Sequence, residues 1–408
     1  MAAGLLSHTV SDLCLGKPAL RSLPAAAATV GDALSALRSS GEACLSVWSC
    51  DHSSSSSSDG GGAAPEGEGG FGCRCVGKVC MVDVICYLCK DGRLSSPSSA
   101  LKAPLTAILP NVPGLVIHVD PSCSLLEAID LILQGAQNLV VPIVTRFTTK
   151  TRRKQHQKPS PTPTLHDGRE FCWLTQEDIV RFLLNSIGLF SPIPALSIDD
   201  LGIVSADILV ADYDSPASSA VGAIARSLAE QTSVAIVDGD GVLIGEISSF
   251  ALAACDETAA AAIATLSCGD LLAYIDCGGP PEELVRVVKA RLQERGLQAT
   301  INEFAISPSN SNPSLSSDEE CAAATPTSVL LRKLGRCNSR LFSYSSRLVR
   351  RSEAIVCNPK SSLVAVMIQA IAHRVNYVWV IEEDCSLIGI VTFYHMLEVL
   401  REHLENLA

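Results

Sequence analysis

The chain has 408 residues, of which 47% are hydrophobic, 4% aromatic and 18% charged. This length is enough for two domains of ordinary size, with cores built mainly from aliphatic side chains. The formal net charge of −12 argues against nonspecific binding of nucleic acid through the phosphate backbone. No apolar run is long enough to cross a bilayer, so we expect no membrane partner. The 17 cysteines, with no secretory signal, are expected to be reduced thiols in a cytoplasmic protein.

Residues 11–92 form the first and most diverged of four copies of one pattern. In this pattern a short strand is followed by an amphipathic helix, two strands and a second helix. The first helix of copy one is predicted from Val30, Ala33, Leu34 and Leu37, which share one helical face. Strands are predicted at residues 44–48 and 76–80. The Ser- and Gly-rich segment 50–72 between them is expected to be a disordered insert.

Residues 110–190 form the second copy. Its strands are predicted at residues 116–119, 139–143 and 171–175, with helices after the first and the third. A basic, Pro-rich insert at residues 146–169 interrupts it at the same point as in copy one. The run Lys150–Lys154 is interpreted as a solvated loop, with a nuclear localisation signal or a docking patch as the alternatives.

Residues 198–275 form the third copy, in which the tight turn Asp238–Gly241 replaces the insert. Residues 276–306 are predicted to be a connecting helical segment, because apolar residues recur on one face after Pro281. Residues 307–340 are rich in Ser, Asn and Pro and are expected to be a flexible linker.

Residues 350–408 form the fourth and clearest copy. A strand at residues 354–357 precedes a helix whose apolar stripe begins at Leu363. Strands are predicted at Tyr377–Ile381 and Leu387–Thr392, and the last helix begins at Phe393. A unit of this size cannot bury its own apolar face, so the four copies must pack together.

The order and spacing of these elements resemble the CBS domain, and the chain as a whole is similar to the plant CBS domain-containing proteins of the CBSX type. The third copy carries the second-strand signature of that family in Ser233–Ser248, and the fourth carries it in Val380–Thr392. The resemblance implies an α/β (α+β) fold. Four β-α-β-β-α repeats would form two pseudo-symmetric pairs that pack as a disc.

The resemblance also implies a ligand site. In the family, adenine nucleotides lie between paired repeats and contact a G-x-(V/I)-(S/T)-x-x-D segment. The hydroxyl lies at a helix N-cap, where it and free backbone N–H groups can hold a phosphate, and the Asp can accept two ribose hydroxyls. Copy two keeps both polar groups, Thr175 and Asp178, and copy one keeps Asp83. Copies three and four keep only the hydroxyls of Ser248 and Thr392.

The same residues also fit a purely structural role. Thr175 and Asp178 have the spacing of a helix capping box, and Ser248 and Thr392 are suitable N-caps without any ligand. Since the first pair holds both carboxylates, we expect AMP, ADP or ATP to bind there if a nucleotide binds at all.

No catalytic or metal-ligating constellation is apparent in the sequence. Cys86 and Cys89 have a CxxC spacing that could bind zinc, but they are interpreted as core or incidental thiols on a helix. The histidines have no nucleophile at a recognisable motif, and no phosphate-binding glycine loop is present. We therefore expect that the chain is not an enzyme.

The leading hypothesis is a noncatalytic regulatory module that binds an adenosine nucleotide in the first pair and modulates an unknown partner protein. Energy sensing is the setting that the family resemblance implies. One alternative is a ligand-free interaction scaffold, and another is a kinase regulatory subunit resembling the γ subunit of the AMP-activated kinase. The sequence also leaves homodimerisation open.

Overall fold

The computed structural model describes residue 5 and residues 7–50, 72–90, 92–110, 112–143, 165–276, 281–304 and 352–407. These residues form four three-stranded sheets, each with its strands in sequence order. In every sheet the first strand runs parallel to the second, and the third runs antiparallel to it. The predicted α/β class and the fourfold repeat are therefore confirmed.

The elements of the first two repeats follow the predicted order. After α2 (Val10–Leu13), the first repeat contains β1 (Ser22–Pro24), α3 (Val30–Ser40), β2 (Cys44–Ser49), β3 (Arg74–Cys80) and α4 (Met81–Leu88). After the short α5 (Pro97–Ala100), the second contains β4 (Val116–His118), α6 (Leu125–Leu133), β5 (Asn138–Ile143), β6 (Glu170–Thr175) and α7 (Gln176–Asn185).

The last two repeats follow the same order, with extra helices after the third. The third contains β7 (Val210–Asp212), α8 (Val221–Glu230), β8 (Val234–Val237), β9 (Leu243–Ile247) and α9 (Ser249–Ala253), then α10 (Ala259–Thr265), α11 (Cys268–Asp276), α12 (Glu282–Glu294) and α13 (Gln298–Glu303). The fourth contains β10 (Val356–Cys357), α15 (Leu363–His373), β11 (Tyr377–Ile381), β12 (Leu387–Thr392) and α16 (Phe393–Leu407). The predicted linker 307–340 lies outside the described residues.

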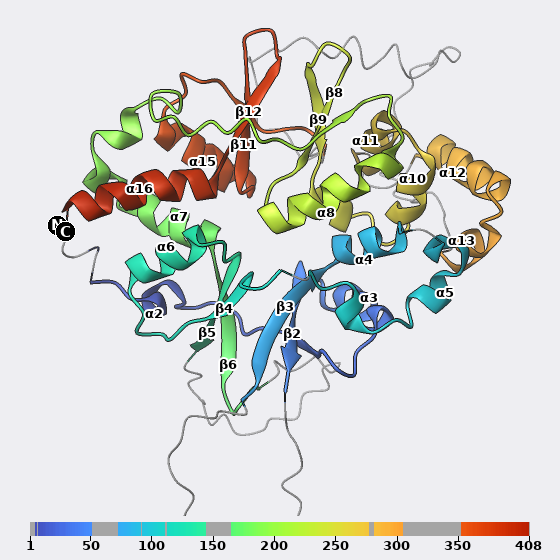
Figure 1. Cartoon of the computed structure of the whole chain (residues 1–408), viewed down its shortest axis with the longest axis horizontal. Helices are drawn as coiled ribbons and strands as arrows, with labels where there is room; N and C mark the ends of the chain where they lie inside the picture. The colour runs from blue at the N-terminus through green and yellow to red at the C-terminus, as the bar shows by residue number, and fades with distance from the viewer. Residues whose placement is uncertain are drawn as a thin grey trace, which may run out of the picture.

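Sheets pack against sheets within each sequential pair of repeats. Between repeats one and two, Trp48, Cys75 and Val140 form a buried cluster. Between repeats three and four, Ala235 and Trp379 belong to the corresponding cluster. The two pairs of sheets lie at opposite edges of the molecule, one at the top and one at the bottom of Figure 1.

Helices pack against helices across the two pairs. One core cluster joins the helices of repeat one to those of repeat three, and α4 contacts α8, α9 and α10. A second joins repeat two to repeat four, and α16 contacts α6 and α7. The helices thus fill the middle of the molecule between the outer sheets (Figure 1). Each repeat buries its sheet against one neighbour and its helices against another, which gives the two-by-two disc.

The chain that leads into repeats one, three and four lies along the last strand of the pair partner. Leu20 donates its N–H to Phe171 O (2.7 Å), and Ser205 exchanges two main-chain hydrogen bonds with Ile390 (both 2.9 Å). The segment before repeat four crosses in turn to β9 of repeat three, where Glu246 N–H donates to Ser352 O (2.9 Å). The first residues of the predicted ranges 11–92 and 198–275 pack on the partner repeat; α2, for example, contacts α7 and β5.

The structure describes residues at the ends of both predicted inserts. Cys50 and Gly72, the two ends of the expected insert 50–72, are described, and Cys50 directly follows Ser49, the last paired residue of β2. Residues 166–169, at the end of the expected insert 146–169, form a tight turn closed by two main-chain hydrogen bonds. Composition alone could not predict the placement of these residues, because it depends on contacts with residues distant in sequence, such as that between Cys73 and Asp167. The remainder of both inserts lies outside the described residues.

The crossing segments explain two glycines of the family signature. A Cβ added at Gly389 would lie 2.6 Å from Ser205 O and 2.7 Å from Val204 Cγ1. One at Gly245 would lie 2.8 Å from Ser352 O. Contacts this short force the backbone to move, so glycine is required where the crossing segment approaches.

We predict that Gly389→Ala lowers the free energy of unfolding by about 1–3 kcal/mol, as overpacking of a tight contact does. Gly188→Ala is the control, because a Cβ there meets nothing within 4 Å. Urea unfolding of both variants measures the difference. Equal stabilities of the two variants would contradict the tight packing of residues 204–205 on β12.

Candidate functional site

A cavity of about 720 Å³ lies where all four repeats meet. This volume is in the range typical of small-molecule sites, roughly 300–1,000 Å³. Its polar lining residues include Lys78, Asp83 and Lys90 of repeat one, Gln137 of repeat two, Ser227, Gln231, Thr232, Glu246 and Ser248 of repeat three, and His373, Arg374, Asn376 and Tyr377 of repeat four. The cavity therefore belongs to the whole disc and not to one pair.

Two of the five predicted site residues, Asp83 and Ser248, line this cavity together. Both lie where the third strand of a repeat turns into its second helix. Asp83 accepts the N–H of Cys80 at 2.7 Å, and Ser248 Oγ accepts the N–H of Ala251 at 3.2 Å. Burial raises the pKa of Asp83, against the opposing effects of the Cys80 hydrogen bond and the nearby Lys78. The contact between α4 and α9 brings these two ends together from different pairs.

Thr175 and Asp178 are placed elsewhere and form the complete capping box of α7. Asp178 Oδ2 accepts both the N–H (2.8 Å) and the hydroxyl (2.6 Å) of Thr175. The ammonium group of Lys17, on the crossing segment before β1, also binds the Asp178 carboxylate. Neither Thr175 nor Asp178 lines the central cavity.

Thr392 also caps a helix, with an imidazole in place of the missing carboxylate. His395 Nδ1 lies 3.2 Å from both the main-chain N and the hydroxyl of Thr392. Burial lowers the pKa of His395, which favours the neutral ring that accepts the N–H of Thr392. Replacement of Asp by His at this position thus preserves the cap.

Two cavity residues occupy backbone positions that favour glycine. Gln231 (φ 55°) and Arg374 (φ 57°) are the left-handed C-cap residues of α8 and α15. In repeat one the equivalent residue after α3 is Gly41 (φ 66°). A non-glycine residue in this conformation is disfavoured by about 1 kcal/mol, and sequence analysis did not identify either residue. Both side chains border the cavity. The two strained non-glycine residues thus lie where a side chain can contact a ligand.

Amide side chains join three repeats around the cavity. Gln137 Nε2 donates to Leu228 O at 3.0 Å, and Gln231 Nε2 donates to Gln137 O at 3.2 Å. Asn376 Nδ2 donates to Gln231 Oε1 at 3.0 Å. The buried hydroxyl of Thr232 has no hydrogen-bond partner among the described residues. An unpaired buried hydroxyl at the wall of a cavity is a group that a polar ligand could satisfy.

A buried carboxyl, Glu246, joins the sheets of repeats three and four beside the cavity. Tyr377 Oη donates to Glu246 Oε1 at 2.9 Å, and Trp379 Nε1 donates to Oε2 at 2.6 Å. Burial raises the pKa of Glu246 from 4.5 to about 7, although both hydrogen bonds favour the charged form. The charge of Glu246 therefore changes close to neutral pH.

Among the described residues, Cys86 and Cys89 belong to no group of three or more potential metal ligands. Cys86 lines the cavity, and Cys89 Sγ donates to Ala260 O at 3.7 Å. Burial raises the pKa of Cys86 to about 12. Within the described ranges, the group of three potential ligands is instead Cys50, Cys73 and His166.

In the described part of the chain, no helix has both the length and the apolar character needed to cross a membrane.

Known proteins resemble this chain in sequence and in fold. The CBS domain-containing protein CBSX5 of Arabidopsis thaliana is 50% identical over 415 residues, which cover 100% of both chains. The CBS domain-containing protein CBSX6 of the same plant is 26% identical over 97% of this chain and 94% of its own. No family model matches the sequence. A solved Methanocaldococcus jannaschii protein, described as an archaeal homologue of γ-AMPK, matches with a TM-score of 0.51 at 14% identity, over 96% of this chain and 100% of that one. This last similarity concerns the fold alone.

We predict that Glu246→Gln changes how stability depends on pH. Between pH 4.5 and about 7 the folded chain holds the Glu246 proton and the unfolded chain has lost it. This group therefore stabilises the fold fully at low pH, and its contribution falls by about 3 kcal/mol as the pH rises through that window. Gln can accept from Trp379 and donate to Tyr377, so the network survives without a titrating group.

Unfolding free energies at pH 5 and pH 8 test this, because other titrating groups contribute equally to both proteins. The unfolding free energy of the variant minus that of wild type should be higher at pH 8 than at pH 5. A difference between the proteins that is the same at both pH values would show that Glu246 does not titrate in this window.

Proposed function

Because the chain belongs to the family of CBS domain-containing proteins, we propose that it is a noncatalytic regulatory module whose central cavity binds an adenosine nucleotide. The observation that carries this proposal is that Asp83 and Ser248 line one cavity together with two cationic residues, Lys78 and Arg374. A ribose and a phosphate need these two kinds of partner.

The groups divide by chemistry along the cavity wall. A carboxylate such as Asp83 can accept hydrogen bonds from two ribose hydroxyls. Lys78, Lys90 and Arg374 can neutralise phosphates, and the Arg guanidinium can bind a phosphate through two N–H groups. Apolar side chains, among them Ile108 and Val375, border the same space and could contact a base. The partly apolar, partly polar lining is typical of ligand sites that orient one small molecule.

Regulation would follow from the position of the cavity. Since residues of all four repeats line it, a ligand there favours the arrangement of the repeats that fits it best. A partner protein bound to two repeats would respond to that shift. This proposal moves the site from the first pair, where sequence reasoning expected it, to the junction of the two pairs.

Asp83→Asn and Asp178→Asn form a matched pair that tests the site. Each Asp is the third residue of a second helix and accepts the N–H of its N-cap residue, Cys80 or Thr175. We predict that Asp83→Asn weakens nucleotide binding about tenfold or more, since hydrogen bonds to a charged group contribute roughly 1.5–3 kcal/mol. Asp178→Asn should leave affinity unchanged.

Calorimetry with AMP, ADP, ATP and S-adenosylmethionine measures this on the full-length protein. A loss confined to Asp178→Asn would place the site in the first pair instead. Wild-type protein that binds none of these compounds would leave the ligand-free scaffold as the better reading.

Arg374→Gly separates binding from stability. Glycine adopts the left-handed C-cap without strain, so we predict a melting temperature no lower than that of wild type. Loss of the guanidinium should weaken ATP more than adenosine, because only ATP carries phosphates. An equal loss for both ligands would exclude Arg374 as a phosphate partner.

A further inference from the structure

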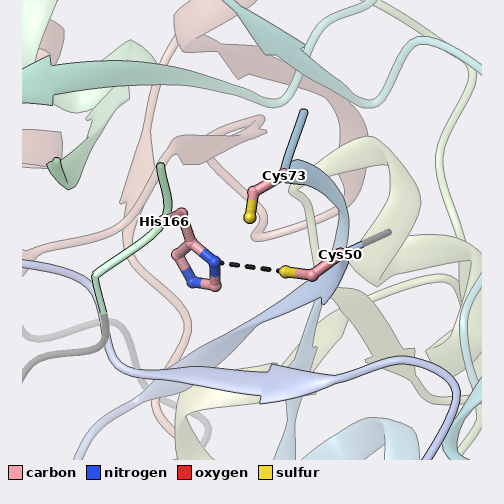
Figure 2. Close-up of side chains that lie close together, drawn as sticks. All are labelled: Cys50, Cys73 and His166. Carbon is pink, nitrogen blue, oxygen red and sulfur yellow. Dashed lines mark hydrogen bonds between the residues drawn. The ribbon is translucent and has the colours of Figure 1, made fainter. Parts of the chain in front are cut away.

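Three potential metal ligands from distant parts of the chain meet at the outer end of the first pair of sheets. They are Cys50, Cys73 and His166, and their ligand atoms all lie within 4.8 Å of one another. Figure 2 shows both sulfur atoms directed toward the imidazole ring. Cys50 Sγ lies 3.3 Å from His166 Nδ1. This cluster shares no residue with the lining of the central cavity.

The hairpin register places the two cysteines opposite each other. The last paired residues of β2 and β3 are Ser49 and Arg74, so Cys50 and Cys73 come next on the two strands. Opposed residues of antiparallel strands have Cα atoms about 4.5–5.5 Å apart. The two thiols therefore flank the point where the insert of repeat one leaves the sheet.

A tight turn in repeat two delivers the histidine to them. Asp167 (φ 50°) and Gly168 (φ 73°) both have positive φ, as the favoured two-residue hairpin turns require. His166 and Arg169 close this turn with two main-chain hydrogen bonds of 2.9 and 3.0 Å. Asp167 Oδ2 accepts the N–H of Cys73 at 2.9 Å, which fixes the turn to the start of β3.

The imidazole ring is held in one orientation. It stacks on Trp48, with ring centroids 3.6 Å apart and planes 5° from parallel. Its Nε2 lies 2.9 Å from Ser22 Oγ, so this nitrogen has a hydrogen-bond partner of its own. Nδ1 is then the nitrogen that faces the sulfurs. A metal-binding histidine is typically oriented in this way by a partner on its other nitrogen.

We propose that Cys50 Sγ, Cys73 Sγ and His166 Nδ1 bind one zinc ion. Two thiolates and an imidazole match the preference of Zn²⁺ for soft sulfur and nitrogen ligands. Tetrahedral zinc requires ligand atoms roughly 3.5–3.8 Å apart, which small rotations of the two cysteine side chains provide. On binding, each thiol releases its proton to solvent, and two Zn–S bonds and one Zn–N bond form. The group found among the described residues holds three ligands, which leaves the fourth position of a tetrahedral site for a water molecule.

Zinc at this position would fasten two repeats to each other. Cys50 and Cys73 belong to the hairpin of repeat one, whereas His166 precedes β6 of repeat two. The ion would also close the base of the first insert and hold the end of the second. It would stabilise the folded protein by mass action, since the unfolded chain does not present the three ligands together.

Metal titration of the full-length protein tests the proposal. Chelator-treated protein, kept reduced with a phosphine, is titrated with Zn²⁺, or with Co²⁺ as a spectroscopic probe. We expect one equivalent to bind, a thiolate-to-cobalt charge-transfer band to appear, and zinc to raise the melting temperature. Cys50→Ser, Cys73→Ser and His166→Asn should each weaken binding at least about tenfold. Cys385→Ser, in the corresponding hairpin of repeat four, should bind like wild type.

Wild-type protein that binds no Zn²⁺ or Co²⁺ under these conditions would overturn the proposal, whatever the folding of the variants. Retention of wild-type affinity by both cysteine variants would do the same. So would a Cys50–Cys73 disulfide, found by peptide mass analysis of protein purified without reductant, if the reduced protein binds no metal.

Discussion

The structure depends on the fact that each repeat has two apolar surfaces and can bury neither alone. A three-stranded sheet with two helices on one side leaves the other face of the sheet and the outer side of the helices exposed. Sheet packing against the pair partner buries Trp48 on one edge of the disc and Trp379 on the other. Helix packing across the pairs buries the remaining faces in two large clusters. Four repeats are the smallest set in which every unit has both kinds of neighbour.

The two sheet interfaces solve the same packing problem with different chemistry. In the second pair a buried carboxyl, Glu246, accepts hydrogen bonds from two aromatic side chains of repeat four. In the first pair Trp48 contacts the imidazoles of His118 and His166, and its own Nε1 donates to Ser46 Oγ at 2.9 Å. One interface thus contains an acid and the other contains nitrogen and sulfur donors. The two interfaces therefore differ in side-chain chemistry, although their backbones share one plan.

Local pattern predicted the elements well, because strand and helix periodicity depend on neighbours in sequence. The strands Tyr377–Ile381 and Leu387–Thr392 and the helix that begins at Phe393 were predicted with the bounds that the structure has. The tight turn at Asp238–Gly241 was also predicted, and Gly241 has the positive φ (79°) that such turns use. These features need no knowledge of how the repeats are arranged.

Features that depend on the arrangement could not be predicted from local sequence. Asp83 and Ser248 were each recognised as candidates, but in separate pairs, because nothing local shows that repeat one packs on repeat three. Lys17 lies 161 residues from the carboxylate that it binds, and His166 lies 116 residues from Cys50. The sequence does show that Cys50 and His166 each lie at the edge of a predicted insert. That observation has meaning only once the two hairpins are known to lie side by side.

The central cavity and the cluster of Cys50, Cys73 and His166 lie at different interfaces of the same disc. Residues of all four repeats line the cavity, so a ligand bound there would affect the helix packing between pairs. A metal at the cluster bears on the sheet packing within the first pair alone. Because repeat one takes part in both interfaces, a more rigid first pair would hold β3, and with it Asp83 at the start of α4, more firmly in place. Ligand binding in the cavity would then cost less conformational entropy at the part of its lining around Asp83. A metal at the cluster would in this way increase the affinity of the cavity.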